Sequence, residues 1–279
     1  MITKLQQSHV EEYAYLPEHI VTYVTAISQA EPFVLQDFLA YVKEEHLTFV
    51  GYPLQEAFDE KRMKGVLDEA IRRFMPKEIS LIAPTIPSSI TGSPHSPSDH
   101  YYKLDLSALS IPQKTRSMIK RAMGELTVNA VRAFEEDHRH LVNEFLSSHP
   151  VHEATQRIFR RIPLYMKSVP TASVFEARTR EGELAAFDIA EFGAKYYAIY
   201  MFNFRSKERY IPGASDLILS RVINQAITEQ KKYLNLGLGI NPGVTFFKTK
   251  WGGTPFHPYT YCLYSPRHKE SLEALLQKL

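Results

Sequence analysis

The stretch Tyr233-Leu-Asn-Leu-Gly-Leu-Gly-Ile-Asn-Pro-Gly-Val-Thr-Phe-Phe-Lys-Thr-Lys-Trp-Gly-Gly253 decides the fold of this chain. A short apolar run, typical of a strand, ends in glycines and Asn241. Pro242 then opens a helix of about two turns that stops at a Gly-Gly pair, because proline suits the first helical turn and glycine the position after the last. A helix predicted over 216–229 precedes the strand, and a Pro-Gly-Ala-Ser turn precedes that helix. The order is therefore loop, helix, strand, asparagine, short helix, glycine.

Strands alternate with helices along the rest of the chain. Apolar spacing predicts that residues 1–46 are mainly helical, with Val34, Phe38, Tyr41 and Val42 forming a second helical group after Pro32. Strands are predicted over 47–52, 78–83, 100–106, 126–134, 172–178, 184–191, 196–203 and 257–264. Further helices are predicted over 59–74, 113–123, 135–147, 153–167 (bent or broken at Pro163) and 269–276. The second half repeats, in longer form, the order of the first, which favours an α/β fold of two related modules.

Composition limits the class of protein. The 279 residues are 44% hydrophobic and 23% charged with a net charge of +2, so neither nucleic acid nor a membrane is an obligatory partner. No apolar run approaches the roughly 18 residues that span a bilayer, and the first residues lack the apolar region of a secretory signal. Cys262 is the single cysteine, which excludes an intrachain disulfide. A soluble cytoplasmic protein is therefore expected.

The second half resembles the GNAT N-acyltransferase fold. That family shows an asparagine after its fifth strand, a small residue three positions later, an aromatic hydroxyl seven later and a glycine eleven later. The corresponding residues here are Asn241, Val244, Lys248 and Gly252, so lysine replaces the usual tyrosine.

The resemblance is closer to the two-module relatives of that family, the FemX/FemAB-type aminoacyl transferases and the lysylphosphatidylglycerol synthase catalytic domains. The Phe247-Lys248 pair before Trp251-Gly252 looks like the Fem-type version, and the basic helix over 114–122 is also similar. The resemblance covers 113–265 well and the first half in outline. It implies an α/β fold of two tandem GNAT-like modules, with a mixed twisted sheet flanked by helices. The N-terminal module (1–110) is reduced, and the C-terminal module (111–279) carries the donor site.

The loop before the helix over 216–229 is the expected donor site. In GNAT proteins this loop binds the pyrophosphate of acyl-CoA through amides at a helix N-terminus, which is a physically favourable anion site. Arg209, Gly213, Ala214 and Ser215 are its candidate residues, although Tyr210 occupies the place of the usual basic residue. The alternative is that Ser215 or Asp216 simply caps the helix.

Two further residues complete the expected donor site. Asn241 follows the strand, and Lys248 is expected to face the cleft and neutralise a phosphate or carboxylate, as the Fem-type lysine does. Lys250, two positions later, points to another side of the short helix and is expected to be solvated.

Acyl transfer to an amine needs a base for the amine and an acid for the leaving group. Glu191 and Asp188 on the strand over 184–191 are the candidate bases, on opposite faces because their separation is odd, and Tyr200 is the candidate acid. No metal is expected, because the histidines of 138–152 do not form a ligand pair on one helix face.

Three functions remain open at this stage. The first is an N-acyltransferase that uses acyl-CoA as co-substrate and a small-molecule or peptide amine as acceptor. The second is a Fem-like transferase that uses aminoacyl-tRNA, which the absence of a coiled-coil arm disfavours. The third is a non-catalytic binding module on the same fold.

Overall fold

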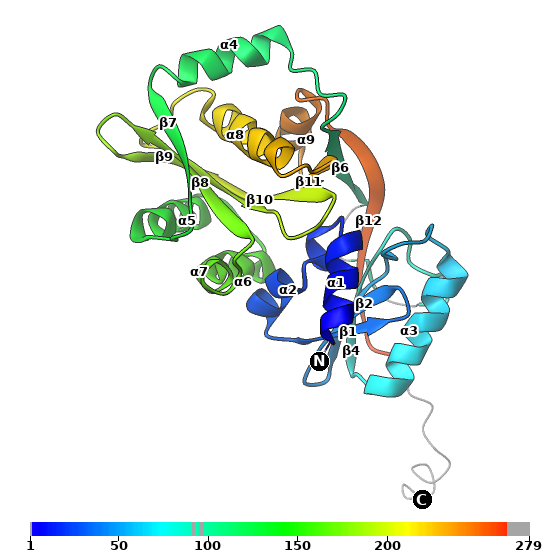
Figure 1. Ribbon diagram of the computed structural model, residues 1–279. Helices are drawn as coiled ribbons and strands as arrows, with labels where there is room; N and C mark the ends of the chain where they lie inside the picture. The colour runs from blue at the N-terminus through cyan, green and yellow to red at the C-terminus, as the bar shows by residue number, and fades with distance from the viewer. Residues whose placement is uncertain (1, 91–92, 95–97, 267–279) are drawn as a thin grey trace, which may run out of the picture.

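The computed structural model describes residues 2–90, 93–94 and 98–266, and it has a large mixed sheet with helices on both faces (Figure 1). The helix predicted over 269–276 lies outside the described residues. The helical elements are α1 (Lys4–Tyr13), η1 (Pro17–His19), α2 (Val21–Ser28), α3 (Glu60–Phe74), α4 (Gln113–Ala122), α5 (Glu136–Ser148), α6 (Glu153–Arg160), α7 (Ile162–Ser168), α8 (Ala214–Thr228) and α9 (Pro242–Thr249). The strands are β1 (Glu31–Leu35), β2 (Phe38–Lys43), β3 (His46–Val50), β4 (Glu78–Ala83), β5 (Ser93–Pro94), β6 (Asp99–Asp105), β7 (Leu126–Val131), β8 (Ala172–Thr179), β9 (Leu184–Glu191), β10 (Tyr197–Arg205), β11 (Tyr233–Leu238) and β12 (Thr254–Tyr264).

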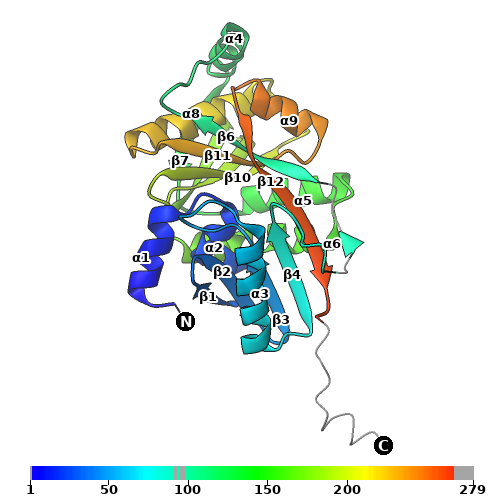
Figure 2. The same cartoon turned by 90° about the vertical axis from the view of Figure 1, so that its right-hand side faces the viewer.

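One long strand joins the two halves of the sheet. The strand order is β1-β2-β3-β4-β12-β6-β11-β10-β9-β8-β7, with β5 paired beside β12. The first half of β12 pairs with β6, and its second half, from Thr260 to Tyr264, pairs with β4. Figure 2 shows β12 running from the C-terminal half of the sheet into the N-terminal half. The division at residues 110 and 111 stays a prediction, and β6, which precedes it in sequence, pairs with β11 and β12.

The C-terminal half has helices on both faces of its strands. α8 and α9 cover one face, and α5, α6 and α7 cover the other (Figure 1). Strand β9 is buried along its whole length. Its small side chains, such as Ala186 and Ala190, face α8, whereas Phe187 and Ile189 fill the space toward α5 and α7. The small side chains allow α8 to approach the sheet closely.

The prediction of a mainly helical 1–46 is wrong for residues 31–43. These residues form the hairpin β1–β2, with Leu35 opposite Phe38 and a two-residue turn between them. Gln36 takes the left-handed conformation (φ 54°) that such turns require, although the turn contains no glycine. Four consecutive residues of β2 from Phe38 to Tyr41 are buried, so the alternation that identifies a strand is absent.

The break predicted at Pro163 is confirmed. α6 ends at Arg160 and α7 begins at Ile162, so that the proline occupies the first turn of the second helix.

Candidate functional site

Strands β10 and β11 separate in the middle of the sheet. They pair in parallel only where Tyr197–Ile199 lies beside Tyr233–Asn235. Beyond these residues β10 pairs only with β9, and β11 only with β6. Each strand also has a break in its register at this point, which bends it away from its neighbour. We call this divergence, which begins at Tyr200 and Leu236, the splay.

The N-terminus of α8 follows β10 directly and has free amides. Gly213 precedes the helix with φ 85°, and no side chain caps it. The amide of Ala214 donates to the Ile211 carbonyl at 3.2 Å, whereas the amides of Ser215 and Asp216 have no acceptor among the described residues. The alternative that Ser215 or Asp216 caps the helix is therefore wrong. The Ser215 hydroxyl instead donates to Asn203 Oδ1 at 2.9 Å.

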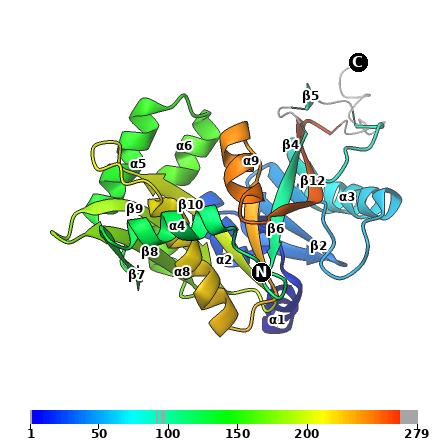
Figure 3. The same cartoon turned by 90° about the horizontal axis from the view of Figure 1, so that it is seen from above.

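Helix α4 packs against this turn from one side (Figure 3). A Cβ on Gly213 would lie 2.9 Å from the Met118 carbonyl oxygen and 3.4 Å from the Ala122 side chain. Glycine is required here both by this contact and by the positive φ. Pro212 is exposed, and Gly213 and Ser215 are half-buried, so the turn stays accessible from its other side.

Two of the predicted donor-site residues are engaged elsewhere. Arg209 donates to both carboxylate oxygens of Glu183, at 2.6 and 2.7 Å, so its charge is already paired. Asn241 is exposed, and its Oδ1 accepts the Val244 amide at 3.0 Å, which makes it the cap of α9.

Lys248 lies at the splay. Its side chain is buried, and its ammonium donates to the Leu238 carbonyl oxygen. A Cβ on Gly237 of β11 would lie 3.7 Å from Lys248 Nζ and 3.9 Å from the Tyr200 carbonyl oxygen of β10. The nitrogen therefore lies beside β11, near the point where β10 separates from it. Burial lowers the pKa of Lys248 to about 7, although the negative charge of Asp99 acts to raise it. With a pKa of about 7, both protonation states are populated near neutral pH.

The prediction that Lys250 is solvated is wrong. Its ammonium contacts both carboxylate oxygens of Asp216, at 2.7 and 2.8 Å. The fully buried Trp251 donates its indole N–H to Asp216 Oδ1 at 2.8 Å. This triad fastens the first turn of α8 to the end of α9, and it turns the Asp216 carboxylate away from the free amides.

Asp188 and Tyr200 lie together under the first turn of α8. The Asp188 carboxylate and the Tyr200 hydroxyl are both buried, and the two groups interact with one another. Burial raises the pKa of Asp188 well above its usual range. Burial also raises the pKa of Tyr200, and the charges of Asp188 and Asp216 raise it further. Burial therefore favours the neutral form of this carboxyl over its charged form.

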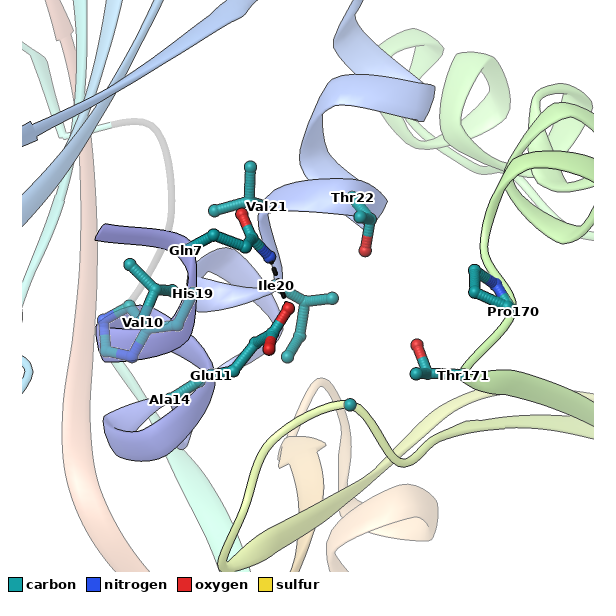
Figure 4. A pocket seen from close by; sticks show the side chains of 11 residues that line it. Gln7, Val10, Glu11, Ala14, His19, Ile20, Val21, Thr22, Pro170 and Thr171 are labelled. Atoms are coloured by element: carbon teal, nitrogen blue, oxygen red, sulfur yellow. Dashed lines mark hydrogen bonds between the residues drawn. The ribbon is translucent and has the colours of Figure 1, made fainter. Parts of the chain in front are cut away.

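Glu191 lies on the opposite face of the sheet. Its carboxylate accepts from the Tyr165 hydroxyl at 2.5 Å and from the amides of Phe192 and Gly193 at 3.1 and 2.9 Å. Gly193 lines a small cavity of about 100 Å³ between α1, the start of α2 and Thr171 (Figure 4). Glu191 and Asp188 therefore face different sides and do not share one site.

Within residues 2–90, 93–94 and 98–266, no three potential ligands among histidine, cysteine and carboxylate side chains gather closely enough to hold a metal ion. A search of the same residues found no helix with the length and apolar character needed to cross a bilayer.

No protein family and no curated protein matches the chain. Several solved structures resemble the chain. FemX is 10% identical to it with a TM-score of 0.63, and the alignment covers 100% of this chain and 98% of FemX. The C-terminal domain of a putative lysylphosphatidylglycerol synthetase from Agrobacterium fabrum is 12% identical with a TM-score of 0.60. That alignment covers 98% of this chain and 94% of the domain. A tandem GNAT protein from the clavulanic acid biosynthesis pathway is 10% identical with a TM-score of 0.50. That alignment covers 83% of this chain and 79% of the tandem GNAT protein. These likenesses show the fold: this chain has the tandem GNAT-like fold of the FemX group.

Proposed function

We propose that this protein is an N-acyltransferase that transfers an acyl group from acyl-CoA to an amine. The general acyltransferase fold supports this function, and one observation carries it: the unbonded amides of Ser215 and Asp216 open beside the splay. Such amides, together with the positive end of the α8 dipole, suit the pyrophosphate of a donor. The acyl group would then lie in the gap between β10 and β11.

Lys248 supplies the acid of this proposal. The acceptor nitrogen forms its bond to the acyl carbon, the carbon–sulfur bond breaks, and the thiolate takes a proton from the Lys248 ammonium. The proton that the acceptor nitrogen loses then returns to the neutral Lys248 amine. A lysine with a pKa of about 7 gives up its proton more readily than an ordinary lysine. Asp188 and Tyr200 lie together in the buried layer that faces α8, and their assignment as base and acid stays a prediction.

A second candidate donor is aminoacyl-tRNA, which the surface of α4 favours. Lys114, Arg116, Lys120 and Arg121 are exposed on this helix, and α4 packs against the same Gly213 turn. A nucleic acid would therefore find a basic surface next to the anion site. Its binding would weaken steeply with salt, in proportion to the number of phosphates contacted.

The donor proposal is tested by calorimetric titration with CoA and acetyl-CoA. Ser215→Glu is expected to weaken binding by about 10–100-fold, because a carboxylate on the first turn of α8 repels the pyrophosphate. Ser215→Gln is the matched control, since it has the same size and lacks the charge, and it should bind within about threefold of the parent.

Absence of CoA binding by the parent would contradict the acyl-CoA donor. Under that outcome, the second donor would be supported if aminoacyl-tRNA binds in a salt-dependent way. This binding should be lost when the charges of Lys120 and Arg121 are reversed. Binding of neither would leave the third function, a non-catalytic module.

A further inference from the structure

The turn between β11 and α9 has a strained backbone. The Asn241 amide donates to the Gly239 carbonyl at 2.6 Å, which closes a three-residue turn with Ile240 at its centre. Ile240 takes a φ of 60°, a conformation that a β-branched residue adopts only under constraint. Its side chain is 75% exposed, so apolar burial does not hold it in place. Backbone contacts must therefore stabilise this turn.

The carboxylate of Asp99, at the start of β6, supplies these contacts. Its Oδ1 accepts the Gly239 amide at 3.1 Å, and its Oδ2 accepts the Ile240 amide at 2.8 Å. Hydrogen bonds to a charged acceptor are the stronger kind. A Cβ on Gly239 would lie 2.6 Å from Asp99 Oδ1, so glycine is what allows the carboxylate to approach. Because the two amides are consecutive, one carboxylate holds the backbone of the turn on both sides of the Gly239 carbonyl.

Helix α9 contacts the same turn through two side chains. The Lys248 ammonium donates to the carbonyl of Leu238, the residue that precedes the turn. The Thr245 hydroxyl donates to the Gly239 carbonyl at 3.4 Å. The turn is therefore bonded to Asp99 of β6 and to α9 at once. A shift of the turn would move the carbonyl that Lys248 binds.

Asp99 also acts on Lys248 through its charge. Two other groups lie near the lysine nitrogen: the ring of Tyr102 on β6, at 5.9 Å, and Gly237 of β11, where a Cβ would lie 3.7 Å away. Neither carries a charge. Among the described residues, Asp99 supplies the charge that raises the pKa of Lys248, against the burial that lowers it. Loss of this carboxylate would therefore disfavour the ammonium form.

We infer that Asp99 positions Lys248 for proton transfer, because it holds the strained turn next to the carbonyl that the lysine binds and supplies the negative charge that favours the ammonium. Both carboxylate oxygens of Asp99 accept backbone amides, so Asp99 is a positioning residue rather than the base that meets the acceptor. This inference rests on the proposed function, since it names the residue that prepares the acid of the same site.

The first test follows the protonation of Lys248 through stability. Urea denaturation from about pH 5 to 9 measures the difference in unfolding free energy between a protein with Lys248→Met and the same protein without it. This difference begins to change at the pH where the folded chain starts to release the lysine proton. In an Asp99→Asn background this onset should lie about one pH unit lower, because the charge that favours the ammonium is lost.

The second test measures the contact with the turn. Amide hydrogen exchange of Ile240 should be at least about 10-fold faster in Asp99→Asn, because the asparagine presents a donor where the second carboxylate oxygen was. Asp105→Asn is the matched control for both tests. Asp105 ends the same strand, accepts the amide and hydroxyl of Ser107, and loses the same charge. It should leave both the onset and the exchange unchanged.

Asp99→Asn combined with Ile240→Gly is measured as well, for the case that the single variant does not fold. Glycine adopts a φ of 60° without strain, so the turn then depends less on Asp99. The double variant should show the same lower onset. An onset that stays unchanged on loss of the Asp99 charge, or that Asp105→Asn lowers equally, overturns the inference, as does unchanged exchange of Ile240 in Asp99→Asn. Since no donor is used, a lower onset supports the role of Asp99 even where CoA does not bind, and an unchanged onset overturns it even where CoA binds.

Discussion

Replacing Asp216 with alanine is expected to lower the free energy of unfolding by about 3–5 kcal/mol. The change leaves the Lys250 ammonium without its countercharge and the buried Trp251 indole N–H without its acceptor. The Trp251 side chain is fully buried, and the side chains of Lys250 and Asp216 are 19% and 5% exposed. Urea denaturation of parent and variant, followed by tryptophan fluorescence, measures the loss, because Trp251 is the single tryptophan.

The matched controls are Lys250→Met and the double variant Asp216→Ala with Lys250→Met. The double variant should recover part of the loss, because no uncompensated charge remains in it. A loss below about 1 kcal/mol in Asp216→Ala, typical of exposed ion pairs, would show that the triad is solvated and does not fix α8 to α9.

The fold could be predicted best where glycine, proline and a capping side chain mark an element. Pro242 opens α9 as the sequence indicates, and Asn241 before it is the cap. The same reasoning fails over 31–43, where both faces of β2 are covered from Phe38 to Tyr41. Val34, Phe38 and Tyr41 then match a helical spacing only because most of their neighbours are apolar as well.

The candidate site was harder to predict, because its contacts join residues distant in sequence. The opposite facing of Lys248 and Lys250 follows from their spacing, but the partner of Lys250 is Asp216, which lies 34 positions earlier. Spacing alone therefore assigns Lys250 to solvent.

The buried amine of Lys248 also makes stability depend on pH. Its pKa is about 7 in the folded chain and about 10.4 in an unfolded one. Between these values the unfolded chain holds the proton and the folded chain releases it, so folding becomes more favourable as the pH rises. Below pH 7 both states are protonated and this dependence ends. The raised pKa values of Asp188 and Glu18 act in the opposite direction at lower pH, so a direct comparison with a variant is needed.

Lys248→Met removes this titration and keeps the volume of the side chain. The variant should be more stable than the parent at pH 7, and its advantage should shrink by up to about 1.4 kcal/mol for each pH unit as the pH rises toward 10. Urea denaturation of both proteins at pH 7, 8 and 9 measures the difference, from which the contributions of Asp188 and Glu18 cancel because both proteins retain them. A difference that does not change with pH would mean that Lys248 keeps its proton throughout. Its ammonium would then be a fixed cation beside the splay, and the acid assigned to it would be lost.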